Sequence, residues 1–261
     1  MDVQLNVYNL EAMLAQPPQA FAFVRFDPNN DCNVRCAYCH NHRSAATVAT
    51  ADLRRFVEEN VLSTEGFQIG CIMEPTLDPR LAELFELIGD SPAAPRVVFS
   101  MHTNGILLHR HDPQRMVAAG LNEVVVSVDT ADSSVHKALR GGTSLTKVTR
   151  NVGNLCRAFP DLRVDFATTV TTANASHLEE LVLLGIDLGV AGFTFREMFH
   201  HPESDVVEHA RLRTLKLRHG VFAALREQIT ARFGKQVHLI FTDAPTLVAK
   251  ADRTDRDSLR V

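Results

Sequence analysis

The sequence predicts an α/β protein, a partial (β/α)6 barrel of parallel strands with helices on its outer side. Six times along the 261 residues, a short run rich in β-branched and aromatic residues is followed by a longer segment of helical periodicity. The strand runs are mostly apolar, as expected of a parallel sheet that helices cover. Crossovers between parallel strands are right-handed, so successive units curl the sheet toward a barrel. A doubly wound open sheet is the alternative that the same alternation allows.

The elements follow one another in a regular order. The expected strands are 21–27, 66–74, 96–103, 122–129, 163–171 and 192–198. The expected helices are 50–62, 78–90, 112–120, 144–159, 174–189 and one long helix over 210–233. Thr50 is a suitable N-cap for the first helix, and Pro79 lies in the first turn of the second. A last β-like run covers 237–243. We therefore expect an N-terminal extension over 1–20, the barrel with its C-terminal helix and strand over 21–243, and a polar tail over 244–261.

The composition is that of a soluble globular protein, with 45% hydrophobic and 22% charged residues. The net charge of −4 gives no general attraction to nucleic acid or to anionic membranes, so neither is expected as a partner. No apolar run is long enough to span a bilayer, and the first residues lack the basic and apolar regions of a secretory signal. The expected location is the cytoplasm, where thiols stay reduced.

Polar residues stand where each expected strand ends. They lie within the segments Glu74–Pro75, His102–Gly105, Ser127–Asp129, Thr168–Thr172 and Arg196–Met198. The carboxyl ends of the strands form the site-bearing face of barrels and of open α/β sheets. If 66–74 is one strand, Glu74 points into the barrel mouth and Cys71 points toward the helices as a buried, inert thiol. Cys156, on the expected helix 144–159, is a second core thiol.

Three of the five cysteines lie within eight residues, directly after the first strand. Cys32, Cys36 and Cys39 form the pattern C-x3-C-x2-C, which lets one loop aim three thiolates at a common point. Structural zinc requires four ligands, and His40 or His42 would have to be the fourth because no second ligand pair follows. The stretch CAYCH matches a c-type haem attachment site, but this would leave Cys32 without a role. A cubane iron–sulfur cluster takes four thiolates as a rule, and with three of them one iron keeps an open position for chemistry. An iron–sulfur cluster is the favoured interpretation, with zinc and haem as alternatives.

The cysteine trio with Tyr38 before its last member resembles the signature of the radical S-adenosylmethionine (radical SAM) superfamily. Three further segments resemble that family in the same order along residues 21–200. They are GCIMEPTLDP at 70–79, which is similar to the family's G-G-E-P segment, TNG at 103–105, and SVDTADSSVHKALRGG at 127–142. Ile72 and Met73 stand in place of the family's two glycines, a departure that bears on how closely a methionine ammonium group approaches the backbone there.

The resemblance implies a role for each matching residue. Cys32, Cys36 and Cys39 would bind a [4Fe–4S] cluster whose fourth iron takes the methionine part of S-adenosylmethionine (SAM). The other implied SAM contacts are Tyr38 beside the adenine, Glu74 at the ammonium group, Ser127 and Arg140 at the carboxylate, Asp129 or Asn104 at the ribose, and Met198 or the backbone of 195–197 at the adenine. Arg196 and Glu197, with His200 and His201 just beyond them, are the expected substrate-side residues.

The implied function is reductive cleavage of SAM to a 5′-deoxyadenosyl radical, which abstracts a hydrogen atom from a small molecule or peptide, such as a natural-product or cofactor precursor. A barrel lined by Val, Ile and Phe would keep water from the radical. The expected electron donor is a protein such as flavodoxin or ferredoxin. No cysteine follows Cys156, which predicts a single-cluster member without an auxiliary-cluster domain. The alternative from another class is a non-enzymatic iron–sulfur or zinc-binding carrier or regulator.

Overall fold

The computed structural model describes residues 21–60, 64–90, 98–199 and 209–244. The expected N-terminal extension, residues 245–261 of the expected tail, and His200 and His201 lie outside the described residues. Within the described part of the chain, no helix combines the length and apolar character that crossing a membrane requires.

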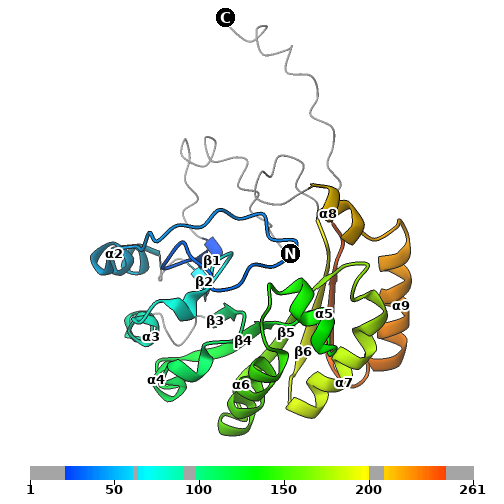
Figure 1. Cartoon of the computed structure of the whole chain (residues 1–261). Coiled ribbons are helices and arrows are strands. Elements are labelled where there is room, and N and C mark those ends of the chain that lie inside the picture. Colours follow the sequence, from blue (N-terminus) through cyan, green and yellow to red (C-terminus); the bar gives the residue numbers. More distant parts are fainter. Residues whose placement is uncertain (1–20, 61–63, 91–97, 200–208, 245–261) are drawn as a thin grey trace, which may run out of the picture.

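Seven parallel strands form one sheet, in which each strand pairs with its neighbours in sequence. The strands are β1 (Phe21–Phe26), β2 (Thr64–Ile69), β3 (Val98–Thr103), β4 (Leu121–Ser127), β5 (Arg163–Val170), β6 (Gly192–Glu197) and β7 (His238–Thr242). The sheet curls and carries its helices on the outside, which confirms the partial barrel (Figure 1). The sequential strand order excludes the doubly wound alternative, because that fold reverses its strand order within the sheet. The β-like run at 237–243 extends the sheet beyond the six expected strands.

The helices follow the expected order, with two differences. They are α2 (Thr50–Asn60), α3 (Leu81–Gly89), α4 (Pro113–Ala118), α5 (Ser133–Leu139), α6 (Leu145–Ala158), α7 (Leu178–Leu188), α8 (His209–Leu215) and α9 (Val221–Phe233). The single helix expected over 210–233 is wrong, because α8 ends at Leu215 and α9 starts after Gly220, whose φ of +82° interrupts helical geometry. Helix α5 was not expected, and Asp132 starts it by accepting hydrogen bonds from the backbone N–H groups of Ser134 and Val135.

The two faces of the sheet differ in polarity. The face toward the helices carries the core, including Phe99, Met101, Val124, Val126, Phe166 and Phe193, all at most 1% exposed. The concave face carries the alternate positions, among them Gln68, Ser100, His102, Ser127, Thr169 and Arg196. The expected lining of Val, Ile and Phe is therefore wrong for most of the sheet, because most of these side chains point outward to the helices and only a few, such as Phe23, Val98 and Val125, stand at concave-face positions.

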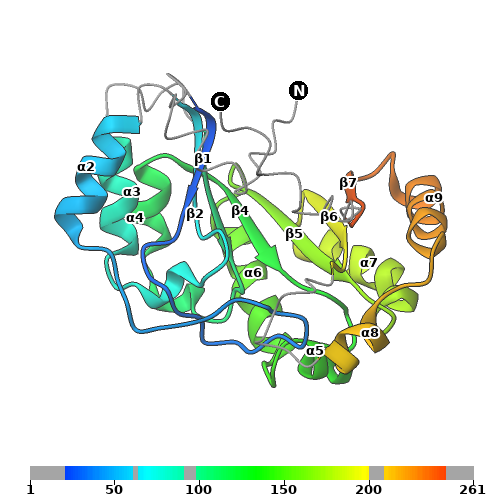
Figure 2. The same ribbon diagram turned by 90° about the horizontal axis from the view of Figure 1, so that it is seen from above.

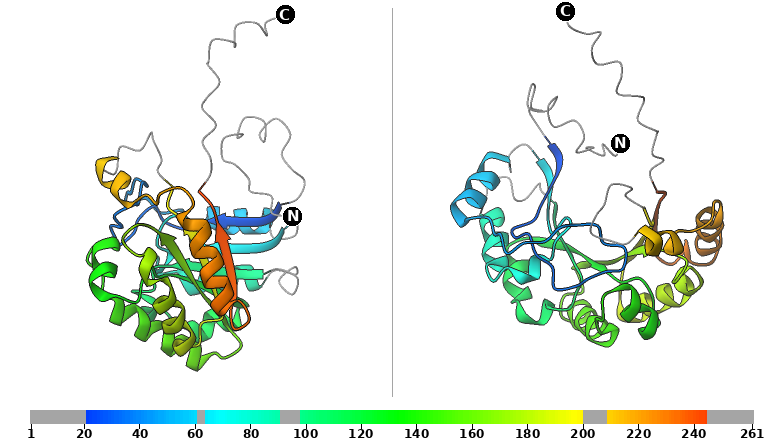
Figure 3. Two further views of the ribbon diagram at one scale, coloured as in Figure 1. Left: turned by 90° about the vertical axis from the view of Figure 1, so that its right-hand side faces the viewer. Right: turned by 45° about the horizontal axis from the view of Figure 1, so that its top comes forward.

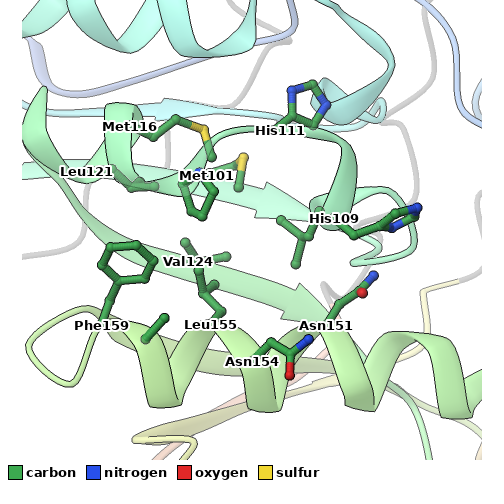
Figure 4. A pocket seen from close by; sticks show the side chains of 13 residues that line it. Met101, His109, His111, Met116, Leu121, Val124, Asn151, Asn154, Leu155 and Phe159 are labelled. Atoms are coloured by element: carbon green, nitrogen blue, oxygen red, sulfur yellow. The ribbon is translucent and has the colours of Figure 1, made fainter.

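A cavity of about 240 Å³ lies on the helix side of the sheet, between strands β3 and β4 and helices α4 and α6. Met101 and Val124 on the strands and Leu155 and Phe159 on or next to α6 line it (Figure 4). Since Met101 and Val124 alternate with the concave-face residues along their strands, the cavity is separated from the concave face by the sheet.

Candidate active site at the carboxyl end of the sheet

The segment between β1 and α2 carries the three cysteines and crosses the carboxyl end of the sheet (Figure 2). Its two arms are tied together by an isolated bridge between Asn29 and Thr47 and by a hydrogen bond of 2.8 Å from the Asn30 N–H to the Ala46 carbonyl. The Ala37 N–H donates to the carbonyl of Leu139 on α5 at 2.8 Å. Figure 3 shows this segment on the same side of the molecule as α5 and α8. The cysteines therefore sit in a loop that is fixed at its base and at its tip.

Each of the three thiols has a nitrogen donor beside it. The sulfur of Cys32 lies 4.0 Å from Asn104 Nδ2, that of Cys36 lies 3.7 Å from Arg140 Nη1, and that of Cys39 lies 3.9 Å from Arg43 Nη2. All three cysteines are free and half-buried. Burial raises the pKa of the Cys32 and Cys36 thiols, whereas N–H donors and cations stabilise a thiolate once a metal has displaced its proton.

The donor set distinguishes between the two metal interpretations. Among the described residues, no three His, Cys, Asp or Glu side chains converge closely enough to hold a single ion. Structural zinc would require the three thiols and a fourth ligand, His40 or His42, to be drawn together around one ion. Three separate thiols on one fixed loop, each with an N–H donor, fit an iron–sulfur cluster, whose sulfurs are tuned by such hydrogen bonds.

Asp129 is the centre of a buried polar network directly behind the cysteines. Its Oδ2 accepts from Tyr38 Oη at 2.5 Å and from Arg140 Nε at 2.7 Å, and its Oδ1 accepts from the Thr169 N–H at 3.0 Å and from Arg140 Nη2 at 3.2 Å. Asp129 is 0% exposed. The Arg140 guanidinium also lies over the Tyr38 ring, 5.9 Å from its centroid. Through Arg140, this network links the end of β4 to Cys36.

Glu74 connects the loops that follow β2 and β3. Its Oε1 accepts from Thr103 Oγ1 at 2.6 Å and from Thr76, and its Oε2 accepts from the Asn104 N–H at 2.7 Å. Glu74 is 1% exposed, and burial raises its pKa even though four protein donors point at its carboxylate. Asn104, which Glu74 positions, donates from Nδ2 to Asn33 Oδ1 at 2.7 Å, next to Cys32.

The strand expected over 66–74 ends early, at Ile69. Gly70 adopts a φ of +86°, and the next three N–H groups, of residues 71–73, donate to the carboxylate of Asp27. Two expectations are corrected by this loop. Cys71 is exposed rather than buried against the helices, and Glu74 reaches its place from a turn rather than from a strand.

The remaining expected residues divide between the two faces. Ser127 Oγ lies 2.9 Å from Nε2 of His102 on the concave face. Burial and the charge of nearby arginines, Arg196 foremost, lower the pKa of His102 to about 3, so this imidazole is neutral. Arg196 faces the concave side, whereas Glu197 leaves the strand on the other side and accepts a hydrogen bond from the Ala244 N–H at 3.2 Å. Met198 is 2% exposed.

The structure thus places most of the expected residues around the cysteine loop. Sequence reasoning placed His102 at the site-bearing end of its strand but gave it no role, and it missed Asn33 as the partner of Asn104 and Asn174, whose Nδ2 donates to the Asp129 carbonyl at 2.7 Å. It also missed Arg25 on β1. The alternation of Arg25 with the apolar Val24 and Phe26 is the one signal in the sequence by which Arg25 could have been found.

A family model described as the radical SAM superfamily matches residues 27–185, more than half of the chain. The chain belongs to the radical SAM superfamily. This confirms the resemblance drawn from the cysteine trio. The cofactors of the superfamily are a [4Fe–4S] cluster and SAM, and the cysteine loop with its nitrogen donors fits such a cluster.

Curated relatives match a little over half of this radical SAM chain. A probable GTP 3′,8-cyclase of Methanococcus maripaludis is 28% identical over 152 residues, 55% of this chain and 48% of the relative. The mycofactocin maturase MftC of Mycobacterium ulcerans is 27% identical over 161 residues, 59% of this chain and 41% of the relative. The chain therefore spans about half the length of the curated relatives it matches, or somewhat less.

Solved structures show the same fold. SuiB of Streptococcus suis, bound to S-adenosylmethionine, superposes with a TM-score of 0.68 at 14% identity and covers 92% of this chain and 54% of SuiB. The protein anSMEcpe, with bound AdoMet and the Cp18Cys peptide, gives a TM-score of 0.63 at 17% identity and covers 83% of this chain and 62% of its own. At these identities the likeness concerns the fold alone.

Proposed function

We propose that this chain is a radical SAM enzyme in which Cys32, Cys36 and Cys39 hold a [4Fe–4S] cluster and SAM binds beside it. Such a cofactor pair supplies a 5′-deoxyadenosyl radical that abstracts a hydrogen atom from the substrate. The observation that carries the proposal is the arrangement of three free thiols in one fixed loop, each beside a nitrogen donor, at the carboxyl end of a curled parallel sheet.

The chain's own residues would bind and orient SAM. Ser127 and Arg140 are assigned to the methionine carboxylate. Asp129 engages Nε and Nη2 of Arg140, which fixes the guanidinium and leaves Nη1 on the side of Cys36. We assign the ribose to Asn104 rather than to Asp129, because both oxygens of Asp129 already accept two hydrogen bonds each.

Glu74, Tyr38 and Met198 complete the proposed SAM site. Because Thr76, Thr103 and Asn104 already donate to the Glu74 carboxylate, we assign Glu74 chiefly to hold the loops around the methionine ammonium group. Tyr38 would pack beside the adenine while its hydroxyl stays on Asp129. Met198 is almost fully buried, so the backbone of its segment would meet the adenine.

We further propose that the substrate is a peptide or a natural-product or cofactor precursor. The support is that one relative is named a maturase, another is named a cyclase, and solved neighbours hold peptides. An electron donor such as flavodoxin or ferredoxin would supply the reducing electron, and the cytoplasm is the proposed location. The three-cysteine loop alone would also suit a non-enzymatic carrier, but a carrier needs no buried network behind its cysteines.

The direct test is cleavage of SAM without substrate. Anaerobically reconstituted protein is incubated with SAM and dithionite, and 5′-deoxyadenosine is measured by mass spectrometry. We expect 5′-deoxyadenosine to form, and to form equally in the control Cys156→Ala, because Cys156 lies on α6 beside Gly189 on the helix side of the sheet. A protein that holds its full complement of iron but releases no 5′-deoxyadenosine would contradict the proposed function and favour the carrier.

A further inference from the structure

Two arginines lie on the concave face near the carboxyl ends of the first and sixth strands. Arg25 is the fifth residue of β1 and Arg196 the fifth of β6, and both are exposed. Arg196 follows the core residue Phe195 along its strand, and Arg25 alternates with Val24 and Phe26, which pack against the core. The strand period of two therefore aims both guanidinium groups into the hollow of the curled sheet.

Among the residues that the structure describes, no carboxylate neutralises either guanidinium group. Among the described residues, Arg25 and Arg196 make no ion pair within 4.0 Å, and the contact found for Arg25 is with the Phe23 ring, 5.3 Å from its centroid. Two other arginines of the sheet and site, Arg163 and Arg140, are paired with carboxylates. At the amino end of β5, Arg163 lies 2.7 Å from Asp165 and 3.3 Å from Glu123, and Arg140 lies 2.7 Å from Asp129. Within the described part of the chain, the contrast marks the carboxyl end of the concave face as a site of positive charge without a carboxylate partner.

The neighbouring carboxylate does not serve as the missing partner. Asp27, two residues beyond Arg25, already accepts hydrogen bonds from the N–H groups of residues 71–73, at 2.8 Å from Cys71, 3.1 Å from Ile72 and 3.1 Å from Met73. Its charge is thus used to hold the loop after β2. His102, which stands between the two arginines in strand order, is neutral and hydrogen-bonds to Ser127.

The two arginines also act on each other. Surrounding protein and the charge of Arg25 lower the pKa of Arg196, although water reaches the side chain from the open side of the sheet. Two like charges that face one hollow without a counter-ion are electrostatically unfavourable, and a bound anion removes this cost. Guanidinium groups bind carboxylates and phosphates through paired hydrogen bonds, which gives such a site direction as well as affinity.

We propose that Arg25 and Arg196 form a subsite for an oxyanion of the substrate, a carboxylate or a phosphate group, and so hold the substrate on the concave face beside the cysteine loop. The substrate class is then acidic rather than neutral or basic. The inference rests on the proposed function, because the oxyanion is taken to be a group of the substrate from which the radical abstracts hydrogen. The presence of an anion site is testable without that reaction.

The test is calorimetric titration of the reconstituted protein with SAM already present, so that the carboxylate site of SAM is filled. Inorganic pyrophosphate represents phosphate ligands, succinate represents carboxylates, and 1,4-diaminobutane is the cationic control. We expect saturable binding of at least one anion, no binding of the diamine, and a loss of affinity of at least about tenfold in Arg25→Gln and in Arg196→Gln. The anion that binds identifies which oxyanion the subsite prefers. Arg25→Lys and Arg196→Lys should fall in between, because lysine keeps the charge but not the fork of donors.

The matched control is Arg54→Gln, which removes the same charge from an exposed position on α2. Its affinity for the anion should equal that of the unchanged protein. Anion-dependent thermal stabilisation provides a second readout and should vanish in the two Gln variants. The inference is overturned if neither anion binds saturably up to about 10 mM, if both Gln variants bind as the unchanged protein does, or if Arg54→Gln loses as much affinity.

The two proposals fail in different ways. If 5′-deoxyadenosine forms but anion binding does not depend on Arg25 and Arg196, the anion subsite alone is wrong. If anion binding depends on both arginines but no 5′-deoxyadenosine forms, the subsite stands and the proposed function is wrong.

Discussion

Replacing Cys32, Cys36 or Cys39 by serine is expected to reduce bound iron from about four atoms per chain to nearly none. Serine keeps the size of the side chain but removes the thiolate that iron in such clusters requires. With only two thiolates left, the loop cannot retain the cluster, and SAM cleavage should fall by at least about 1,000-fold because the cofactor carries the chemistry. Iron and sulfide content and visible absorbance of the anaerobically purified protein measure the effect.

The remaining two cysteines provide the controls. Cys71→Ser removes an exposed thiol from the loop after β2, and Cys156→Ser removes a half-buried one from α6. Both variants should retain their iron and their absorbance. If a loop variant keeps its cluster, or if Cys71→Ser loses it, the cluster is not held by the three cysteines to which we assign it.

Arg140→Met is expected to lower the free energy of unfolding by about 3–5 kcal/mol, the usual cost of leaving one member of a buried ion pair without its partner. Asp129 is 0% exposed, so its carboxylate would stay buried with only the Tyr38 hydroxyl and the Thr169 N–H as donors. Urea unfolding followed by circular dichroism measures the change. A double variant, Asp129→Leu with Arg140→Met, should recover part of the loss because no charge is then left unpaired.

A second ion pair of the same type serves as the control. Arg115 contacts Glu86 through two hydrogen bonds, of 2.8 and 2.7 Å, but their side chains are 49% and 40% exposed. Arg115→Met should destabilise the protein far less than Arg140→Met, since water screens the exposed pair and solvates the partner left behind. If Arg140→Met and Arg115→Met destabilise the protein equally, the Asp129 network does not hold the site together.

The order of strands and helices was predictable because apolar side chains recur with the period of each element. The polarity of the concave face was predictable in principle from the same signal. Gln68 stands between Phe67 and Ile69, and Ser100 between Phe99 and Met101, so polar and apolar residues alternate along β2 and β3. Because an interpretation of these runs as mostly apolar overlooks the alternation, it does not predict the polar character of the concave face.

The loop after β2 shows what local patterns do not specify. Ile72 and Met73 continue the apolar run, yet the strand ends at Ile69. Gly70 turns the chain there, and the N–H groups that follow donate hydrogen bonds to the carboxylate of Asp27, which lies directly after β1. The Asp129 network depends even more on distant contacts. Tyr38 and Asp129 are separated by 91 residues along the chain and meet only through the tertiary fold. Sequence motifs located both residues, but not their contact.

The most direct test of the three-thiolate site is the electron paramagnetic resonance spectrum of the reduced cluster with and without SAM. If Cys32, Cys36 and Cys39 leave one iron without a protein ligand, adding SAM should shift the g values, and S-adenosylhomocysteine or buffer alone should not reproduce the same spectrum. A cluster that keeps one unchanged spectrum at saturating SAM would contradict a SAM site at this loop.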